Sequence, residues 1–400
     1  MHFSRLTLSA ILLSLVVFAN SLPKARADIL MQYPSVSRDS GGMALRLPID
    51  QLTPFRTYLL DSPRRLVVDF GEAALRQFSD QFVRDIPEIS AVRYGLFQPE
   101  NFRMVLDIDM PMAVQSAEIQ AIDGQDPVIL IHLGPVSAAV FSQQSVASDG
   151  NIWAGSLSAP QIAGRAGAPL IAIDAGHGGI DQGAVVDDVF EKDINLQMAK
   201  KMRDVLLESG AFRVVLTREA DVFVPLGARV EIARRAGAVA FISLHADVVT
   251  RGRARGTTVF SLSHADADQE AVTIATLENR GDLVAGISVE GEDDQITSIL
   301  LQLAHRETDA LSNRFADVMA EALWFQNDTE IKSRRMAGGF RVLRAPDIPS
   351  VLIEMGFMSD ASDMEKLQDP EWQLSMAETL RAGLRNWLAI EADMRGLLRN

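Results

Sequence analysis

The stretch at residues 171–179, with the sequence I-A-I-D-A-G-H-G-G, constrains the fold more than any other part of the chain. An apolar run over residues 169–173 leads into a turn of small residues that carries His177. Such a run predicts a buried parallel strand that ends in a loop at its carboxyl end, where open α/β sheets bind ligands. Glycines flank His177, and because glycine has no Cβ, a ligand or metal ion can approach the backbone closely there.

Downstream of this strand, apolar runs alternate with amphipathic segments. We expect strands at 169–173, 213–217, 239–244, 257–262 and 350–355, and helices at 191–209, 226–236, 266–280, 295–324 and 371–390. This alternation indicates an α/β domain over residues 169–392, with a mostly parallel sheet flanked by helices on both faces.

The preceding region, residues 38–135, alternates with a period of two. In the segments 64–70 and 102–108, apolar side chains occupy one face and charged side chains the outward face. This pattern predicts a small all-β domain, a sandwich or a half-open barrel. Residues 136–168 are rich in Ser, Ala, Gly and Gln, and we expect them to form a flexible linker.

The amino terminus has the pattern of a secretory signal peptide. Basic Arg5 precedes an apolar run of 14 residues at 6–19, and Ala25-Arg26-Ala27 matches a small-x-small cleavage site. We therefore expect residues 1–27 to be removed after Ala27, and the mature, exported protein to have no transmembrane segment. The chain has no cysteine, which excludes disulfides, thiolate metal sites and lipid attachment through cysteine. Its net charge of −15 argues against a nucleic-acid partner.

Four residues have the chemistry of a hydrolytic metal site. His177 and His245 each follow an apolar strand, Glu191 opens a helix, and Glu354 lies near the end of another strand. Two imidazoles and one carboxylate are a common ligand set for catalytic zinc, and a further carboxylate can move the proton of a water molecule. The residues are far apart in the sequence, so the spacing leaves purely structural histidines as an alternative. A serine nucleophile has no G-x-S-x-G motif to support it.

The motifs that contain these residues resemble those of a known enzyme family. I-D-A-G-H-G-G-x-D-x-G-A, E-K-D-I-N-L, F-I-S-L-H-A-D and F-R-V-L-R-A-P-D-I-P-S-V-L-I-E-M-G-F-M-S are similar to motifs of the zinc-dependent N-acetylmuramoyl-L-alanine amidases of bacterial cell separation. The resemblance covers residues 169–392. It implies that His177, Glu191 and His245 bind Zn²⁺ and that Glu354 is the catalytic glutamate. The implied reaction cleaves the amide between N-acetylmuramic acid and the first L-alanine of the peptidoglycan stem peptide.

The β region resembles the AMIN domain of exported cell-wall amidases. The similar segments are R-L-V-V-D-F, V-R-Y-G-L-F-Q and F-R-M-V-L-D-I-D. The resemblance implies a module that binds peptidoglycan and targets the periplasmic enzyme to the division septum. A β domain that binds no ligand is the alternative.

The segment after His245 is longer than a connection between strands requires. Family members with such an insertion resemble autoinhibited enzymes, in which a glutamate from an inserted helix occupies the open zinc position. Glu278 is the best match, with Glu290 and Glu292 as alternatives, and an ordinary solvated glutamate is equally compatible with the sequence. The resemblance further implies an activator, a LytM-domain protein of the division machinery.

Two other functions remain open from the sequence: a zinc deacetylase or carboxypeptidase of the cell wall, and a catalytically silent wall-binding regulator. The complete set of four site residues argues against the silent regulator. Asp174 is expected to orient a metal ligand rather than to bind the metal itself. Arg341 and Arg344 are either substrate-binding or solvated, and His132, His264 and His305 are expected to take no part in catalysis.

Overall fold

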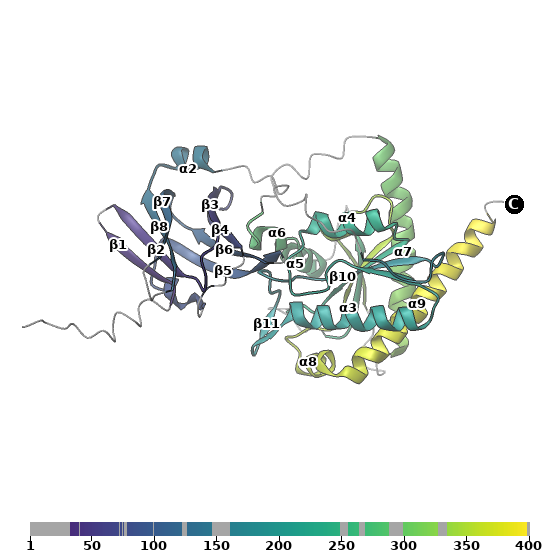
Figure 1. Cartoon of the computed structure of the whole chain (residues 1–400). Helices are drawn as coiled ribbons and strands as arrows, with labels where there is room; N and C mark the ends of the chain where they lie inside the picture. The colour runs from purple at the N-terminus through teal and green to yellow at the C-terminus, as the bar shows by residue number, and fades with distance from the viewer. Residues whose placement is uncertain are drawn as a thin grey trace, which may run out of the picture.

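A computed structural model describes residues 33–39, 41–71, 73, 75, 78–98, 100–121, 126–145, 161–248, 255–263, 269–287, 299–326 and 334–397. They form a β sandwich beside an α/β domain (Figure 1). The expected signal peptide, residues 1–27, lies outside the described residues. Among the helices that the structure describes, none combines the length and the apolar character that a bilayer span needs.

The sandwich consists of two four-stranded antiparallel sheets. One sheet has the order β1 (Ser35–Asp39), β2 (Gly42–Pro48), β8 (Val128–Pro135), β7 (Met112–Gln120). The other has the order β3 (Phe55–Leu60), β4 (Arg65–Gly71), β6 (Asn101–Ile108), β5 (Ile89–Gln98), with a short 3-10 helix, η1 (Asp80–Val83), before β5. Apolar side chains from both sheets form one buried core between them. The structure therefore settles the choice between sandwich and barrel in favour of the sandwich.

The charged face of the β3-β4-β6-β5 sheet does not point into solvent. Alternation in β4 sends Leu66 and Val68 into the sandwich core, as the sequence predicts. Arg65 and Arg103 occupy the opposite face, yet they are only 1% and 2% exposed. They are buried because this face packs against the α/β domain.

Parts of the region 136–168, which the sequence predicts to be a flexible linker, have regular structure. Residues 138–144 form helix α2 (Ala138–Gln144). Ser137 caps its amino-terminal end, and the Ser137 side chain accepts a hydrogen bond from Val140 N. Phe141 of this helix is fully buried in the sandwich core. At the other end, β9 (Ala163–Gly164) pairs with the sheet of the α/β domain. Residues 146–160 lie outside the described residues.

The α/β domain is built on a seven-stranded sheet. Its order is β16 (Arg334–Gly338), β15 (Thr258–Leu262), β17 (Ser350–Glu354), β14 (Ala240–His245), β10 (Leu170–Ala175), β13 (Arg213–Leu216), β9. The expectation of a mostly parallel sheet is confirmed, with antiparallel pairing only at β15·β17 and β13·β9 among the described strands. A small hairpin of β11 (Val185–Val186) and β12 (Val189–Phe190) precedes the first long helix.

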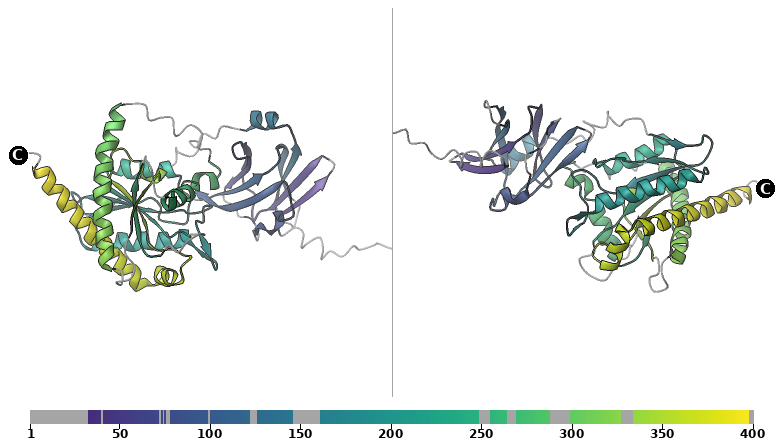
Figure 2. Two further views of the ribbon diagram at one scale, coloured as in Figure 1. Left: turned by 180° about the vertical axis from the view of Figure 1, so that it is seen from behind. Right: turned by 60° about the horizontal axis from the view of Figure 1, so that its bottom comes forward.

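Helices cover both faces of this sheet (Figures 1 and 2). Each face of the sheet packs against a hydrophobic core, and alternate residues of β10 point into the two cores. Ile171 and Ile173 face one core, and Leu170 and Ala172 face the other. The first core includes α3 (Glu191–Glu208), α7 (Ile299–Gln326) and α9 (Pro370–Leu397), and the second includes α4 (Leu226–Ala236) and α5 (Gln269–Glu278). The shorter helices are α6 (Gly281–Val284), η5 (Arg341–Leu343) and α8 (Ala361–Gln368).

The strand order brings the candidate site residues to one edge. β17, β14 and β10 are neighbours, and all three run parallel. His245 and Glu354 are register partners at the carboxyl ends of β14 and β17, and His177 follows β10. The carboxyl ends of three adjacent strands thus form one platform.

The packing of Phe141 generates a prediction about the start of the supposed linker. Phe141→Ala should lower the free energy of unfolding of the β sandwich by about 3–5 kcal/mol, because it removes a fully buried ring. Urea unfolding of the full chain, followed by circular dichroism, measures this. Val140→Ala is the matched control, since Val140 is 37% exposed on the same helix, and should change stability by less than about 0.5 kcal/mol. Equal stability of the two variants would contradict the packing of α2.

Candidate metal centre

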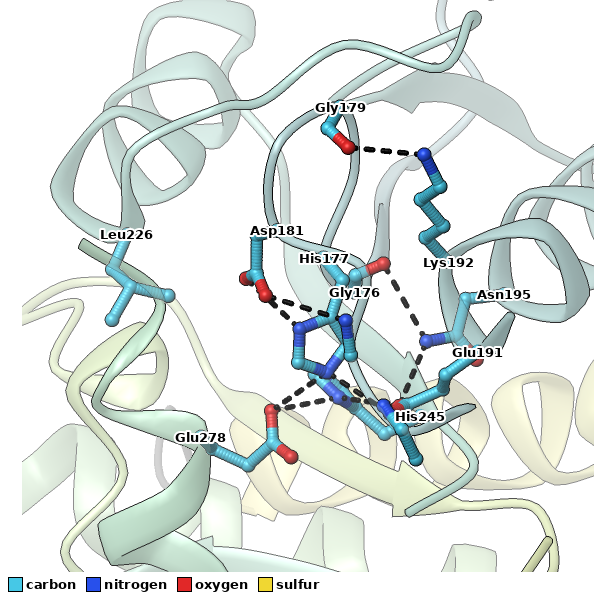
Figure 3. Close-up of polar contacts among 12 residues, drawn as sticks. Gly176, His177, Gly179, Asp181, Glu191, Lys192, Asn195, Leu226, His245 and Glu278 are labelled. Atoms are coloured by element: carbon cyan, nitrogen blue, oxygen red, sulfur yellow. Dashed lines mark hydrogen bonds and ion pairs between the residues drawn. The ribbon is translucent and has the colours of Figure 1, made fainter. Parts of the chain in front are cut away.

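Four buried side chains from four different elements meet at the platform (Figure 3). His177 comes from the loop after β10, Glu191 is the first residue of α3, His245 ends β14, and Glu278 ends α5. Each contributes one potential ligand atom, and these atoms lie within 4.8 Å of one another. His177 Nε2 is 3.2 Å from Glu191 Oε2 and 3.4 Å from Glu278 Oε2, and His245 Nδ1 is 2.8 Å from the same Glu278 oxygen.

The two imidazole nitrogens have the surroundings of metal ligands. Within the described part of the chain, neither His177 Nε2 nor His245 Nδ1 has a hydrogen bond of normal geometry, although both are buried. Both nitrogens point at a common centre shared with the two carboxylates. A buried polar atom without a partner is costly unless something else satisfies it. Two nitrogen and two oxygen donors at this separation fit the tetrahedral site that Zn²⁺ prefers.

The electrostatics of the cluster also favour a cation. Burial alone would raise the pKa of Glu191 and Glu278, but His177 and His245 hold the pKa of Glu191 well below its usual range and lower the pKa of Glu278 to about 2. Burial alone would lower the pKa of the histidines, but the carboxylates raise the pKa of His245 to about 10 and that of His177 well above its usual value. In the metal-free chain, protons on the imidazoles thus compensate the buried negative charge.

The orientation of the His177 ring comes from Asp181. The Nδ1 atom of His177 lies 2.9 Å from Asp181 Oδ2. Such a carboxylate–histidine contact fixes the tautomer and directs Nε2 to the metal position. The sequence analysis does not single out Asp181 as a functional residue, although it is part of the quoted glycine motif. The tight turn that returns it to His177 is closed by two backbone hydrogen bonds between Gly178 and Asp181.

Asp174 acts only indirectly on the metal loop, which is the loop after β10 that carries His177. Its carboxylate accepts hydrogen bonds from Thr217, Ser243 and Arg229, at 2.6, 2.7 and 3.0 Å. Arg229 in turn donates to the backbone oxygen of His177 at 2.9 Å. Burial would raise the pKa of Asp174, but Arg229 and the two hydroxyls lower it, so the pair is ionised. Asp174 therefore positions the backbone of the loop through Arg229, whereas Asp181 positions the ring.

Glu191 is held in place from several sides. Its Oε1 accepts hydrogen bonds from Asn195 Nδ2 at 3.1 Å and from the backbone N–H of Ala246 at 3.0 Å, and its Oε2 from that of Ala184 at 2.9 Å. Gly176 leaves the space that the neighbouring His245 ring occupies, because a Cβ at this position would overlap the ring. The position of the carboxylate is thus determined before any ion binds.

Glu354 lies beside the cluster of four rather than within it. It is fully buried, and its Oε2 accepts a hydrogen bond from the backbone N–H of Asp247 at 3.1 Å. Its Oε1 has no hydrogen-bond partner among the described residues. Burial and the negative charges of Glu278, Asp247 and Glu191 raise its pKa well above the usual value, against a lowering effect of His245. Glu354 is thus a buried carboxyl group with a raised pKa and one oxygen without a hydrogen-bond partner among the described residues, next to the metal position.

Glu278 reaches the cluster because of the face of α5 that it occupies. Ala271, Ile274, Ala275 and Glu278 are buried, at helical spacing. The apolar members pack on the α/β domain, so the same face carries Glu278 inward, where it is only 7% exposed. A solvated Glu278 is therefore excluded. The alternatives Glu290 and Glu292 lie outside the described residues, as does His264.

The remaining charged residues of the sequence analysis lie elsewhere. Arg341 Nη1 is 3.5 Å from Asp282 Oδ2 of α6, so it faces the inserted segment. His132 is a half-buried residue of β8 in the sandwich. His305 lies in α7, and its side chain is outside the described part of the structure.

The chain is similar to known proteins over both of its domains. Residues 171–386 match the family described as N-acetylmuramoyl-L-alanine amidase, and residues 35–130 match the AMIN domain. The chain is 32% identical over 356 residues to N-acetylmuramoyl-L-alanine amidase AmiC of Escherichia coli O6:H1 (strain CFT073), with 85% of each chain covered. It is 29% identical over 360 residues to the protein of the same name from Neisseria meningitidis serogroup B, with 86% of each covered.

Among solved structures, amidase AmiC2 of Nostoc punctiforme is 29% identical and has a TM-score of 0.39, over 55% of this chain and 97% of that chain. The family match covers more than half of the chain, and the Escherichia coli relative exceeds 30% identity over most of both proteins. The chain therefore belongs to the N-acetylmuramoyl-L-alanine amidase family.

Proposed function

We propose that this amidase is a zinc enzyme that cleaves the bond between N-acetylmuramic acid and L-alanine in peptidoglycan, and that its described state is latent. The observation that carries the proposal is the convergence of His177 Nε2, His245 Nδ1 and Glu191, all buried, on one centre. A deacetylase or carboxypeptidase would use the same metal chemistry. The similarity to proteins named N-acetylmuramoyl-L-alanine amidase over both domains favours the amidase.

In the proposed site, His177, Glu191 and His245 hold Zn²⁺, and Asp181 orients the first histidine. Bound zinc supplies a Lewis acid that polarises the substrate carbonyl and lowers the pKa of a water molecule. Glu354 accepts the proton of the attacking water as the C–O bond forms. It then delivers a proton to the amine of L-alanine as the C–N bond breaks.

In the latent (closed) state, in which Glu278 lies in the cluster, proton transfer at Glu354 is suppressed. The negative charge of Glu278 is among the causes that raise the pKa of Glu354. Withdrawal of Glu278 and binding of a cation both lower that pKa toward the working pH, where a general base is most effective. Glu278 therefore affects the proton shuttle as well as access to the metal.

Latency follows from the place of Glu278 in the cluster. Its carboxylate occupies the fourth ligand position, the one that a catalytic zinc site leaves for water or substrate. The activator would be a LytM-domain protein of the division machinery, as the family resemblance implies. Shifting the closed–open equilibrium from 1:99 to 99:1 requires differential binding of about 5.5 kcal/mol.

Three further parts of the proposal concern the setting of the enzyme. The signal peptide at residues 1–27, cleaved after Ala27, would deliver it to the periplasm. The AMIN domain would bind peptidoglycan and place the enzyme at sites of cell separation, and the catalytic domain spans residues 169–392.

Glu354 argues against a silent regulator, because a protein that performs no proton transfer has no use for a buried carboxyl group with a free oxygen.

Metal binding should release protons. About one Zn²⁺ per chain should bind at pH 7 with release of about two protons, because the raised pKa values of His177 and His245 mean that both imidazoles are protonated in the metal-free chain. The affinity should therefore rise with pH between about 7 and 10. Calorimetry of the metal-free protein in buffers of different ionisation enthalpy measures the protons. His177→Ala should bind far less zinc, whereas the control His132→Ala should match the wild type; binding without proton release would refute the ligand assignment.

The role of Glu354 is tested in a chain freed from latency. In the Glu278→Ala background, Glu354→Gln should retain zinc and lose about 10²–10⁴-fold in turnover, because the proton shuttle alone is removed. Zinc content is measured by mass spectrometry and turnover by release of dyed fragments from sacculi. Glu208→Gln, on the exposed end of α3, is the control. A loss of less than about fivefold would rule out Glu354 as the general base.

Glu278→Ala should activate the full-length enzyme on sacculi without an activator, by about tenfold or more, because it opens the fourth ligand position. Thr276→Ala, exposed on the same helix, should leave the activity low. The products should be stem peptides with L-alanine amino termini.

The product analysis separates the competing functions. Free acetate or free D-alanine would instead establish the deacetylase or the carboxypeptidase. If zinc-loaded Glu278→Ala remains as inactive as the wild type, Glu278 is not the inhibitory group.

A further inference from the structure

We propose that the AMIN domain is the second half of the inhibitory device: its outer sheet face clamps the segment that carries Glu278, so the active site opens only when the two domains part. The clamp face is the face of the β3-β4-β6-β5 sheet that carries Arg65, Arg93 and Arg103. The inhibitory segment is residues 269–287, α5 and α6 with the turn that follows. The inference rests on the proposed blocking role of Glu278 and names what holds it.

Arginines from three strands of the clamp face bind backbone oxygens at the end of α6. Arg65 of β4 donates to Leu283 O at 2.8 Å, Arg93 of β5 to Val284 O at 3.0 Å, and Arg103 of β6 to Ala285 O at 2.9 Å. The last carbonyls of a helix have no i+4 donor within the helix, and the arginines donate to them; Leu283 O also accepts a hydrogen bond from Gly286 N at 3.0 Å. Hydrogen bonds with a charged donor are stronger than those between neutral groups.

Two of the arginines are fixed by carboxylates of the same sheet. Asp69 binds Arg103 through two hydrogen bonds of 2.6 and 2.9 Å, and Asp107 pairs with Arg93 at 2.5 Å. The guanidinium groups are therefore positioned by the AMIN domain itself. The segment completes an arrangement that the sheet has already formed.

Apolar contacts fill the space between the arginines. Ala285 and Ile287 are buried with Leu60, Val67 and Val105 of the clamp face in a cluster of their own. Gly286 lies between these two residues with φ of 70°, and a Cβ there would be 3.0 Å from the side chains of Val67 and of Val105. The backbone thus approaches the sheet as closely as a glycine permits.

The same sheet touches the metal loop. β5 passes so close to this loop that a Cβ on Gly95 would be 2.7 Å from the Cα atom of Ile180, three residues after His177. Next to it, the rings of Phe97 and Phe223 stack at 5.7 Å. The AMIN domain therefore contacts both the loop that carries a metal ligand and the segment that covers the metal position (Figure 1 shows β5 and β6 directed at α5 and α6).

A short stretch of chain connects α6 to Glu278, and hydrogen bonds hold this stretch in place. Only Asn279 and Arg280 separate α5 from α6, and Asn279 is itself held by the backbone of Gly339 and Arg341. Asp282 accepts a hydrogen bond from Leu226 N at the start of α4. Withdrawal of Glu278 therefore pulls on α6, and movement of α6 would break the hydrogen bonds between the arginines and its last carbonyls, which is unfavourable. Domain contact and closure of the site stabilise each other.

The experiment removes the clamp from the AMIN side in the full chain. Arg93→Ala/Arg103→Ala should raise the rate of hydrogen exchange in residues 269–287 by about tenfold or more, in both metal-free and zinc-loaded protein, because local opening no longer breaks two charged hydrogen bonds. The same variant should raise activity on sacculi toward that of Glu278→Ala. Arg84→Ala, at an exposed position directly after η1 of the same domain, is the matched control and should change neither quantity.

A second variant guards against simple misfolding of the first. Gly95→Val places a side chain against the backbone of Ile180 from a strand position that accepts β-branched residues, so it wedges the domains apart without deleting a contact within the sandwich. It should also release the protection of residues 269–278. Unchanged protection of this helix in both variants would overturn the clamp. Activity in Glu278→Ala together with low activity in Arg93→Ala/Arg103→Ala would overturn the clamp and leave the proposed function standing. If Glu278→Ala is inactive, the blocking role of Glu278 in the proposed function is contradicted. The hydrogen-exchange rates of residues 269–287 would still test whether the AMIN domain holds this segment.

Discussion

The structure depends on the balance of charge in one buried cluster at the carboxyl ends of β10 and β14. Ionised groups are costly to bury unless each meets an opposite charge or a metal ion. Glu191 and Glu278 are tolerated there because His177 and His245 oppose them. The surrounding elements serve this balance: Asp174 and Arg229 hold the loop, Asp181 directs one ring, and α3 presents Glu191. A bound cation would replace the imidazole protons, and its charge would then balance the two carboxylates in the same geometry.

Much of this arrangement could be predicted from the sequence, because it depends on local patterns. The run 169–173 has only one stable environment, a buried strand, and the residue after such a strand lies at the ligand-binding edge of the sheet. That reasoning places His177 and His245 together. It cannot find the role of Asp181, because the contact requires a turn in which His177 itself adopts a φ of 58°. Backbone conformations of this kind are rare for residues other than glycine and leave no pattern in the sequence.

Contacts between distant segments were beyond the reach of the sequence for a different reason. Alternation shows which residues of β4 and β6 share a face, but it does not show what covers that face. Arg65 and Arg103 have the pattern of solvated residues, although they are among the largest fully buried side chains. For the same reason, the sequence does not identify helix α2: Phe141 is its one buried residue, and it packs into a core formed by the strands of both sheets.

The position of Glu278 has a consequence for the lifetime of a bound metal ion. Two imidazoles and two carboxylates close around one centre, and all four side chains are at most 9% exposed. An ion in such a cage has no ligand position open to water, so a chelator in the surroundings has nothing to attack until α5 moves. The carboxylate that we propose to block the fourth ligand position would thus also slow the loss of the metal ion. A metal ion held in this way would be exposed to loss only while α5 is displaced from the cluster.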